Sequence, residues 1–157
     1  MKDELVRVAR ERGICGEGYK RMLASDREGL VEYYVQNPDW CMERAFPDLQ
    51  TLRDEFSDCE DKGVFVGKEF HGEVLNEKRV YIFHNCRGTI KTGLNLGNAV
   101  IPMLYVGNGC RLRIVGTGVK VPLRDRPVVP VYVFGKNDVS AMDNTYVMFD
   151  RFNRGLR

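Results

Sequence analysis

Residues 80–85 (VYIFHN), 103–109 (MLYVGNG) and 131–137 (VYVFGKN) repeat one pattern. Each copy is a short run of β-branched and aromatic residues that ends on Gly, Asn or both. This composition predicts a strand followed by a tight turn. Because repeated strand-turn units are typical of folds in which similar units stack, the pattern predicts the architecture of the second half of the chain.

A finer spacing lies inside these copies. Val131, Val139 and Val147 are eight residues apart, and each is followed two residues later by another apolar residue. Residues i and i+2 of a strand share one face, so these pairs are expected to point the same way in successive strands. The spacing predicts a small right-handed parallel β-helix (a β-solenoid) with three sides per coil and about 25 residues in each coil. An antiparallel β-sandwich has similar strand and turn spacing and stays open as the alternative.

The first 62 residues carry helix signals instead. Leu5, Val8 and Ala9 have amphipathic spacing in a charged background. Ser25 followed by Glu28 fits a capping box, with Ser25 as the N-cap. The expected helices are too short to be stable alone, so they must pack on another element. We therefore predict an α+β protein in which a helical segment, residues 1–62, packs on or caps a β-rich repeat domain, residues 63–157.

Charge is distributed unevenly along the chain. The 157 residues carry a net charge of +2, yet residues 1–62 hold 10 Lys/Arg against 15 Asp/Glu, and residues 63–157 hold 14 against 7. Such asymmetry fits either mutual attraction of the two segments or a surface for an anionic partner.

The sequence also indicates the cellular compartment in which the protein is expected. No apolar run reaches the length of about 18 residues that spans a membrane, and the charged N-terminus lacks a secretory signal. The five widely spread cysteines do not suggest a disulfide framework. We expect a cytoplasmic protein with reduced thiols and no membrane partner.

Two further stretches carry a resemblance. Residues 39–49 (DWCMERAFPDL) and 85–89 (NCRGT), together with the Val-x-Val/Ala rows, resemble small uncharacterised proteins of gut Bacteroidetes and of their phages or mobile elements. The similarity spans most of the chain. The resemblance implies an N-terminal helical segment that packs on a C-terminal β-helical segment. It implies no functional residues, because no activity is assigned to the group.

Catalytic and metal-binding patterns are scarce. The chain has two histidines, no GxSxG and no Walker pattern. Cys86 or Cys110 could act as a nucleophile with His84 as its base, but like positions in repeated units favour packed structural thiols. We therefore predict no catalytic residue, metal or cofactor.

Basic residues gather late in the chain and form the first candidate site. Arg111 and Arg113 alternate in an expected strand and so share a face. Such a face could bind phosphate or other acidic groups, although it could equally be a solvated strand surface. The candidate ligand-binding residues are Arg111, Arg113, Lys120, Arg124 and Arg126.

The second candidate site is an apolar row, Tyr132, Phe134 and Met142. These side chains point outward if Val131 and Val133 point inward. An outward apolar row must be covered, either by the N-terminal helices or by another copy of the chain.

These observations favour a non-enzymatic protein-interaction or assembly protein that has a protein partner or associates with itself. The alternative is binding of an acidic ligand, nucleic acid or anionic polysaccharide, through the basic face. A hydrolase or lyase acting on a polysaccharide is the third hypothesis, since paired carboxylates near turns are found in sugar-cleaving enzymes.

Overall fold

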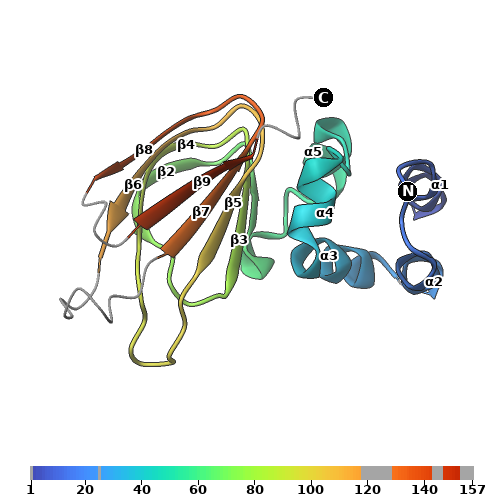
Figure 1. The fold of residues 1–157 in the computed structure, drawn as a ribbon, viewed down its shortest axis with the longest axis horizontal. Coiled ribbons are helices and arrows are strands. Elements are labelled where there is room, and N and C mark those ends of the chain that lie inside the picture. Colours follow the sequence, from blue (N-terminus) through green and yellow to red (C-terminus); the bar gives the residue numbers. More distant parts are fainter. Residues whose placement is uncertain (1, 25, 118–128, 143–146, 153–157) are drawn as a thin grey trace.

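The computed structural model describes residues 2–24, 26–117, 129–142 and 147–152. The chain is α+β, with its helices preceding its strands (Figure 1). The helices are α1 (Lys2–Glu11), α2 (Gly16–Ala24), α3 (Arg27–Gln36), α4 (Pro38–Glu43), α5 (Leu49–Glu55) and a 3-10 helix, η1 (Glu60–Lys62). The strands are β1 (Val64–Val66), β2 (Glu69–Val74), β3 (Val80–His84), β4 (Arg87–Thr92), β5 (Met103–Val106), β6 (Arg111–Gly116), β7 (Val129–Phe134), β8 (Asp138–Met142) and β9 (Val147–Phe152). The predicted boundary at residues 62 and 63 falls between η1 and β1.

The strands form two sheets, and consecutive strands alternate between them. The larger sheet has the order β1-β3-β5-β7-β9, and the smaller sheet has the order β2-β4-β6-β8. Neighbouring strands within each sheet are parallel. In Figure 1 both sheets lie to the left of the helices.

This topology corrects the predicted fold. The antiparallel sandwich is wrong because the paired strands are parallel. The small right-handed parallel β-helix is also wrong: the described strands lie in two sheets and not on three sides of a coil. The strands of the larger sheet begin at residues 64, 80, 103, 129 and 147, so their interval is not constant. The step of eight residues between Val131 and Val147 is a local feature of the chain's end.

The larger sheet is a middle layer with two buried faces. In β3, Tyr81 and Phe83 belong to the hydrophobic core between the two sheets. Ile82 belongs to a second core, which the larger sheet shares with the helices. Burying a large apolar side chain stabilises a fold by roughly 1.5–3 kcal/mol, and the strands of this layer contribute such side chains on both faces. The near-continuous apolar runs that mark the repeats in the sequence are therefore those of the middle layer.

The register of the middle layer stacks similar side chains. Phe65 of β1 lies over Phe83 of β3 with ring centroids 5.6 Å apart. On the helix-facing side, Tyr105 of β5 lies over Tyr132 of β7 with centroids 5.0 Å apart. Because side chains at paired positions of parallel strands fall directly beside one another, each face carries an aromatic or aliphatic ladder from β1 to β7.

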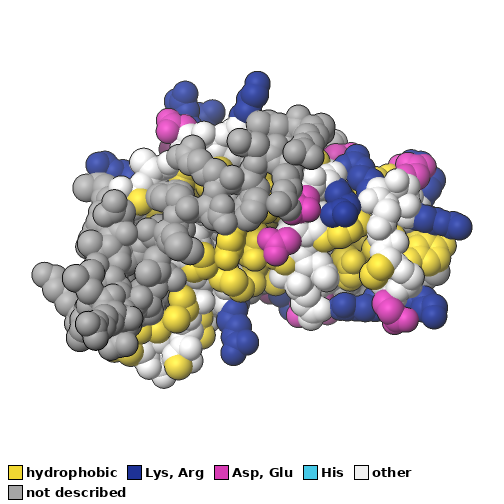
Figure 2. Space-filling model, in the orientation of Figure 1, with side chains coloured by type: hydrophobic (Ala, Val, Ile, Leu, Met, Phe, Trp, Pro, Cys, Tyr) yellow, Lys and Arg dark blue, Asp and Glu magenta, His cyan; other side chains and the backbone are white. Residues whose placement is uncertain are grey.

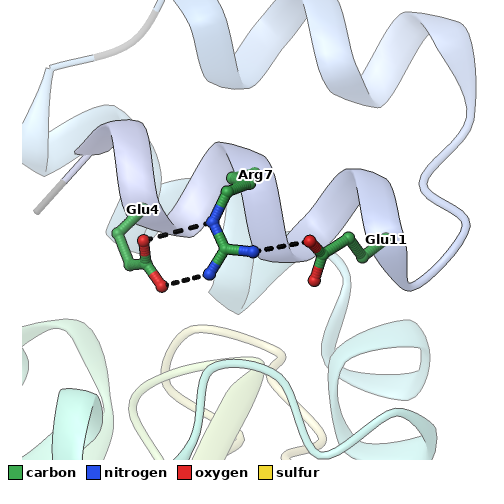
Figure 3. A network of polar contacts seen from close by, with 3 residues as sticks. All are labelled: Glu4, Arg7 and Glu11. Carbon is green, nitrogen blue, oxygen red and sulfur yellow. Dashed lines mark hydrogen bonds and ion pairs between the residues drawn. The ribbon is translucent and has the colours of Figure 1, made fainter.

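The helices cover the other side of the middle layer. Asp26, the N-cap of α3, accepts a hydrogen bond from the backbone N–H of Gly29 at 2.8 Å. It takes the place predicted for Ser25, which lies outside the described residues. In α1, Arg7 lies between Glu4 and Glu11 and contacts each carboxylate at 2.5 Å (Figure 3). These exposed ion pairs contribute little stability, so the helices depend on their buried apolar faces.

The surface of the helical end is rich in charged side chains (Figure 2). Charged side chains of both signs surround the helical end in the space-filling view (Figure 2). Among the described residues, no helix combines the length and the apolar character that a membrane crossing requires.

A buried polar contact joins the helices to the middle layer. The hydroxyl of Tyr34, in α3, is hydrogen-bonded to Nε2 of His84, the last residue of β3. Both side chains are buried, and Tyr34 also packs edge-on against Phe56 with centroids 5.6 Å apart. Burial lowers the pKa of His84 from 6.5 to about 4, because the charged imidazolium would lose its hydration. His84 is therefore neutral at pH 7.

Strands β2 and β4 of the smaller sheet approach each other closely at Gly88. Gly88 in β4 has φ of 108°, a value that side chains disfavour. A Cβ at this position would lie 2.0 Å from the carbonyl oxygen of Phe70 in the neighbouring strand β2. Only glycine fits between these two strands without moving the backbone.

The lowered pKa of His84 predicts a loss of stability in mild acid. The unfolded chain takes up a proton as the pH falls through 6.5, whereas the folded chain does so only near pH 4. The contribution of neutral His84 to the free energy of unfolding is therefore fully present above about pH 7. It is lost as the pH falls toward 4. The free energy of unfolding should decrease by about 2 kcal/mol between pH 7 and pH 5, as measured by urea denaturation.

The matched control for this loss is His71→Asn, because His71 is exposed and is the only other histidine. This variant should keep the pH dependence, and the double variant Tyr34→Phe/His84→Leu should lose it. An equal decrease in the double variant would show that another group is responsible.

The tight contact at Gly88 predicts a large effect of one methyl group. Gly88→Ala should lower the free energy of unfolding by at least about 3 kcal/mol, since it adds a backbone clash to the strain of a positive φ. Gly67→Ala is the control, because Gly67 also has a positive φ, 69°, but its Cβ would meet nothing within 4 Å. It should lose only about 1–2 kcal/mol. Similar losses in both variants would contradict the proposed clash.

Candidate anion-binding face

The smaller sheet has one buried and one open face. Its inward side chains, such as Phe70, Ile90 and Ile114, pack in the core between the sheets. Its outward side chains on the four strands are polar or charged in the first half of each strand, and most of them are exposed. They are Glu69 and His71 on β2, Arg87, Thr89 and Lys91 on β4, Arg111 and Arg113 on β6, and Asp138 and Ser140 on β8.

The parallel register arranges these side chains in rows across the sheet. One row is Glu69, Arg87, Arg111 and Asp138. The next row on the same face, two residues along, is His71, Thr89, Arg113 and Ser140. Adjacent strands are about 4.8 Å apart, so Arg87 and Arg111 are like charges in direct cross-strand positions. Arg113 adds a third guanidinium beside them.

Among the residues that the structure describes, none of the three arginines of this face forms a close ion pair, although Glu69 and Asp138 are cross-strand neighbours of Arg87 and Arg111. The ion pairs found there involve Arg7, Arg27, Arg44 and Lys68. Like charges placed opposite each other in a sheet are destabilising. An anion between Arg87, Arg111 and Arg113 would remove that repulsion.

A shallow hollow of about 240 Å³ lies on this face. Its lining includes the side chains of Thr89 and Ser140, which can donate hydrogen bonds, beside two of the arginines. The lining residues are Gly88, Thr89, Arg111, Leu112, Arg113, Asp138 and Ser140. The hollow is broad and open, which suits part of an extended partner better than an enclosed small molecule.

The sequence-based prediction of ligand-binding residues includes only part of this face. Arg111 and Arg113 share the outer face of β6, as their alternation predicted. Lys120, Arg124 and Arg126 lie outside the described residues. The sequence-based prediction did not include Arg87 and Lys91. Arg87 follows Cys86 just as Arg111 follows Cys110. This similarity between the two segments is the signal that could have indicated the pairing of β4 with β6.

Two residues of the predicted apolar row, Tyr132 and Phe134, lie on the helix-facing side of the middle layer. Phe134 is only 3% exposed and lies in the core beneath the helices. Tyr132 is half-buried against the same core, and the side chain of Met142 is outside the described part. The helices cover Tyr132 and Phe134, so these two residues form no open surface for a partner or a second copy.

The thiols do not form a nucleophilic pair with His84. Cys86 is buried and its Sγ lies 3.4 Å from the backbone oxygens of Phe65 and His84, while Nε2 of His84 is bonded to Tyr34. A hydrogen bond that the Cys110 thiol donates to Cys86, together with burial, raises the pKa of Cys110. Within the described ranges, no group of three or more His, Cys, Asp and Glu side chains could hold a metal ion.

In comparisons with known proteins, no family model, curated protein or solved structure matches this chain. The resemblance to proteins of gut Bacteroidetes and their phages or mobile elements stays a prediction.

The burial of the thiols predicts their reactivity. Cys15 is exposed, whereas Cys41, Cys59, Cys86 and Cys110 are buried, and burial hinders both ionisation and access of a reagent. Under native conditions at pH 8, a chromogenic disulfide reagent should modify one thiol per chain rapidly and the other four only in denaturant. Cys15→Ser should abolish the rapid phase. A rapid phase that persists in Cys15→Ser would show that a buried thiol is activated.

Proposed function

We propose that this chain is a binding protein that holds an anionic polymer against the outer face of the smaller sheet. The observation that supports this most directly is the cross-strand placement of Arg87 and Arg111 with Arg113 beside them. Guanidinium groups bind phosphate and sulfate through paired N–H donors. Three of them on one open surface provide several such contacts at once.

The acidic residues of the face limit where the polymer can lie. Glu69 and Asp138 stand at the two ends of the row that contains Arg87 and Arg111. They would repel a polyanion that crossed the whole sheet along this row. The central strands β4 and β6 carry the positive charge, and Lys91 extends it along β4. The polymer is therefore expected to follow the strand direction over β4 and β6.

The chemistry of the face indicates contact with the polymer's backbone charges. The outward residues of β2, β4, β6 and β8 named above include no aromatic residue other than His71, so base stacking contributes little. Affinity should then be electrostatic and should fall with salt. Nucleic acid and a sulfated polysaccharide share this chemistry.

The experiment measures binding of fluorescent heparin, single-stranded DNA and double-stranded DNA by anisotropy at 50–200 mM salt. Arg111→Gln/Arg113→Gln should weaken binding and should reduce the slope of log K against log[salt] by about 2, since each arginine neutralises about one anionic group. The polymer that binds most tightly identifies the class of ligand.

The matched control is Lys20→Gln/Arg53→Gln, which removes the same charge from exposed positions on α2 and α5. It should leave the affinity nearly unchanged. Equal weakening in both double variants would indicate a general effect of net charge, and a lack of binding by all three polymers at 50 mM salt would refute the proposed function.

A further inference from the structure

A cavity lies on the opposite side of the middle layer from the anion-binding face. It has a volume of about 230 Å³ and is formed where the helices meet the carboxyl ends of β3, β5 and β7. In parallel α/β sheets, ligands commonly bind beyond the carboxyl ends of the strands. The cavity shares no lining residue with the hollow on the outer face.

The cavity wall is mainly apolar. Met42 and Phe46 line it from the segment that contains α4, Leu49 and Leu52 line it from α5, and Phe134 lines it from β7. Exposed polar residues, Arg12, Asp48 and Asn108, also belong to the lining. The wall therefore combines an apolar interior with a polar rim.

Tyr34 and His84 are the polar groups of the buried part of the wall. A neutral imidazole carries one N–H, and a phenol carries one O–H. Their mutual hydrogen bond uses only one of these two protons. If Tyr34 donates to Nε2, the proton on Nδ1 of His84 is left over. If Nε2 donates to Tyr34, the phenolic proton is left over.

No acceptor for this remaining proton is found within the described ranges. The hydrogen bond between Tyr34 and His84 is the one side-chain hydrogen bond found there for either residue. Leaving a buried donor without an acceptor is energetically unfavourable. Whichever tautomer is present, the pair therefore offers one donor from the wall of the cavity.

Gly107 keeps the imidazole in this position. A Cβ on residue 107 would lie 2.2 Å from Nδ1 of His84, so any side chain there would displace the ring. Gly107 also lines the cavity. The first glycine of the second sequence repeat thus makes room for the ring that presents the donor.

We propose that this cavity binds a small, mostly apolar molecule whose single neutral oxygen acceptor, such as a carbonyl, accepts the remaining proton of the Tyr34–His84 pair. The volume is below the range of about 300–1,000 Å³ that is usual for drug-sized ligands, so the molecule is small. A carboxylate fits less well, because burying an anion beside a neutral imidazole is costly.

The experiment compares two probes of nearly the same shape at pH 7.5. Acetophenone has an aromatic ring and one carbonyl oxygen, and ethylbenzene replaces that oxygen with hydrogen. Titrations followed by ¹H–¹⁵N shifts should show acetophenone bound roughly tenfold more tightly than ethylbenzene, because only acetophenone satisfies the buried donor. The shifts should centre on Gly107, Phe134 and Leu52.

Two variants and one control test the location and the donor separately. Leu49→Trp should fill the cavity and abolish binding of both probes, whereas Leu96→Trp, at an exposed position outside the lining, should not. Tyr34→Phe/His84→Leu removes both protons and should bind the two probes equally well.

The proposal is overturned if wild-type protein binds neither probe, or binds both equally, since a buried water would then be sufficient to satisfy the donor. It is also overturned if Leu49→Trp, while folded, binds as the wild type does. The Leu49→Trp test does not depend on the folding of the Tyr34→Phe/His84→Leu variant.

Discussion

The structure depends on a middle sheet that must be buried on both faces. The strands of this sheet carry apolar side chains in both directions, so one covering layer is not enough. The smaller sheet covers one side, and the N-terminal helices cover the other. The helices are short and their exposed ion pairs are weak, and they are stabilised mainly by the apolar surface that they cover. The two parts of the chain therefore share one core, even though the sequence changes character between residues 62 and 63.

The same constraint separates the two candidate sites. The outer sheet needs only its inward side chains for packing, and its outward positions are free to carry Arg87, Arg111 and Arg113. Strands β1, β3, β5 and β7 of the middle sheet are packed on both faces, and His84 is a polar side chain at a strand end. His84 is the last residue of β3, and it meets Tyr34 where the cavity forms. One site is thus an open, charged surface, and the other is a partly enclosed, mostly apolar space.

The sequence predicted the strands of the repeats and the inward direction of Val131 and Val133, because alternation within a strand is a local property. It did not predict how the strands pair. Tyr81 and Tyr132 occupy the same place in the two most similar repeats, yet the register pairs Tyr81 with Leu104 and Leu104 with Val131. A shift of one residue reverses the face, so Tyr81 points to the smaller sheet and Tyr132 to the helices. The partnership of Tyr34 with His84 joins residues 50 positions apart, and no local pattern could reveal it.

The alternation of strands between the two sheets has a consequence for how the chain reaches this structure. No strand pairs with the strand that follows it in the sequence, so the described strands cannot begin as a hairpin and every pairing must close a longer loop. Folding dominated by such distant contacts is slow. The strand order also increases steadily across each sheet, so each strand that leaves the ribosome finds its partner already synthesised. Growth of the sheets in the direction of translation would shorten the time for which their unpaired edges are exposed.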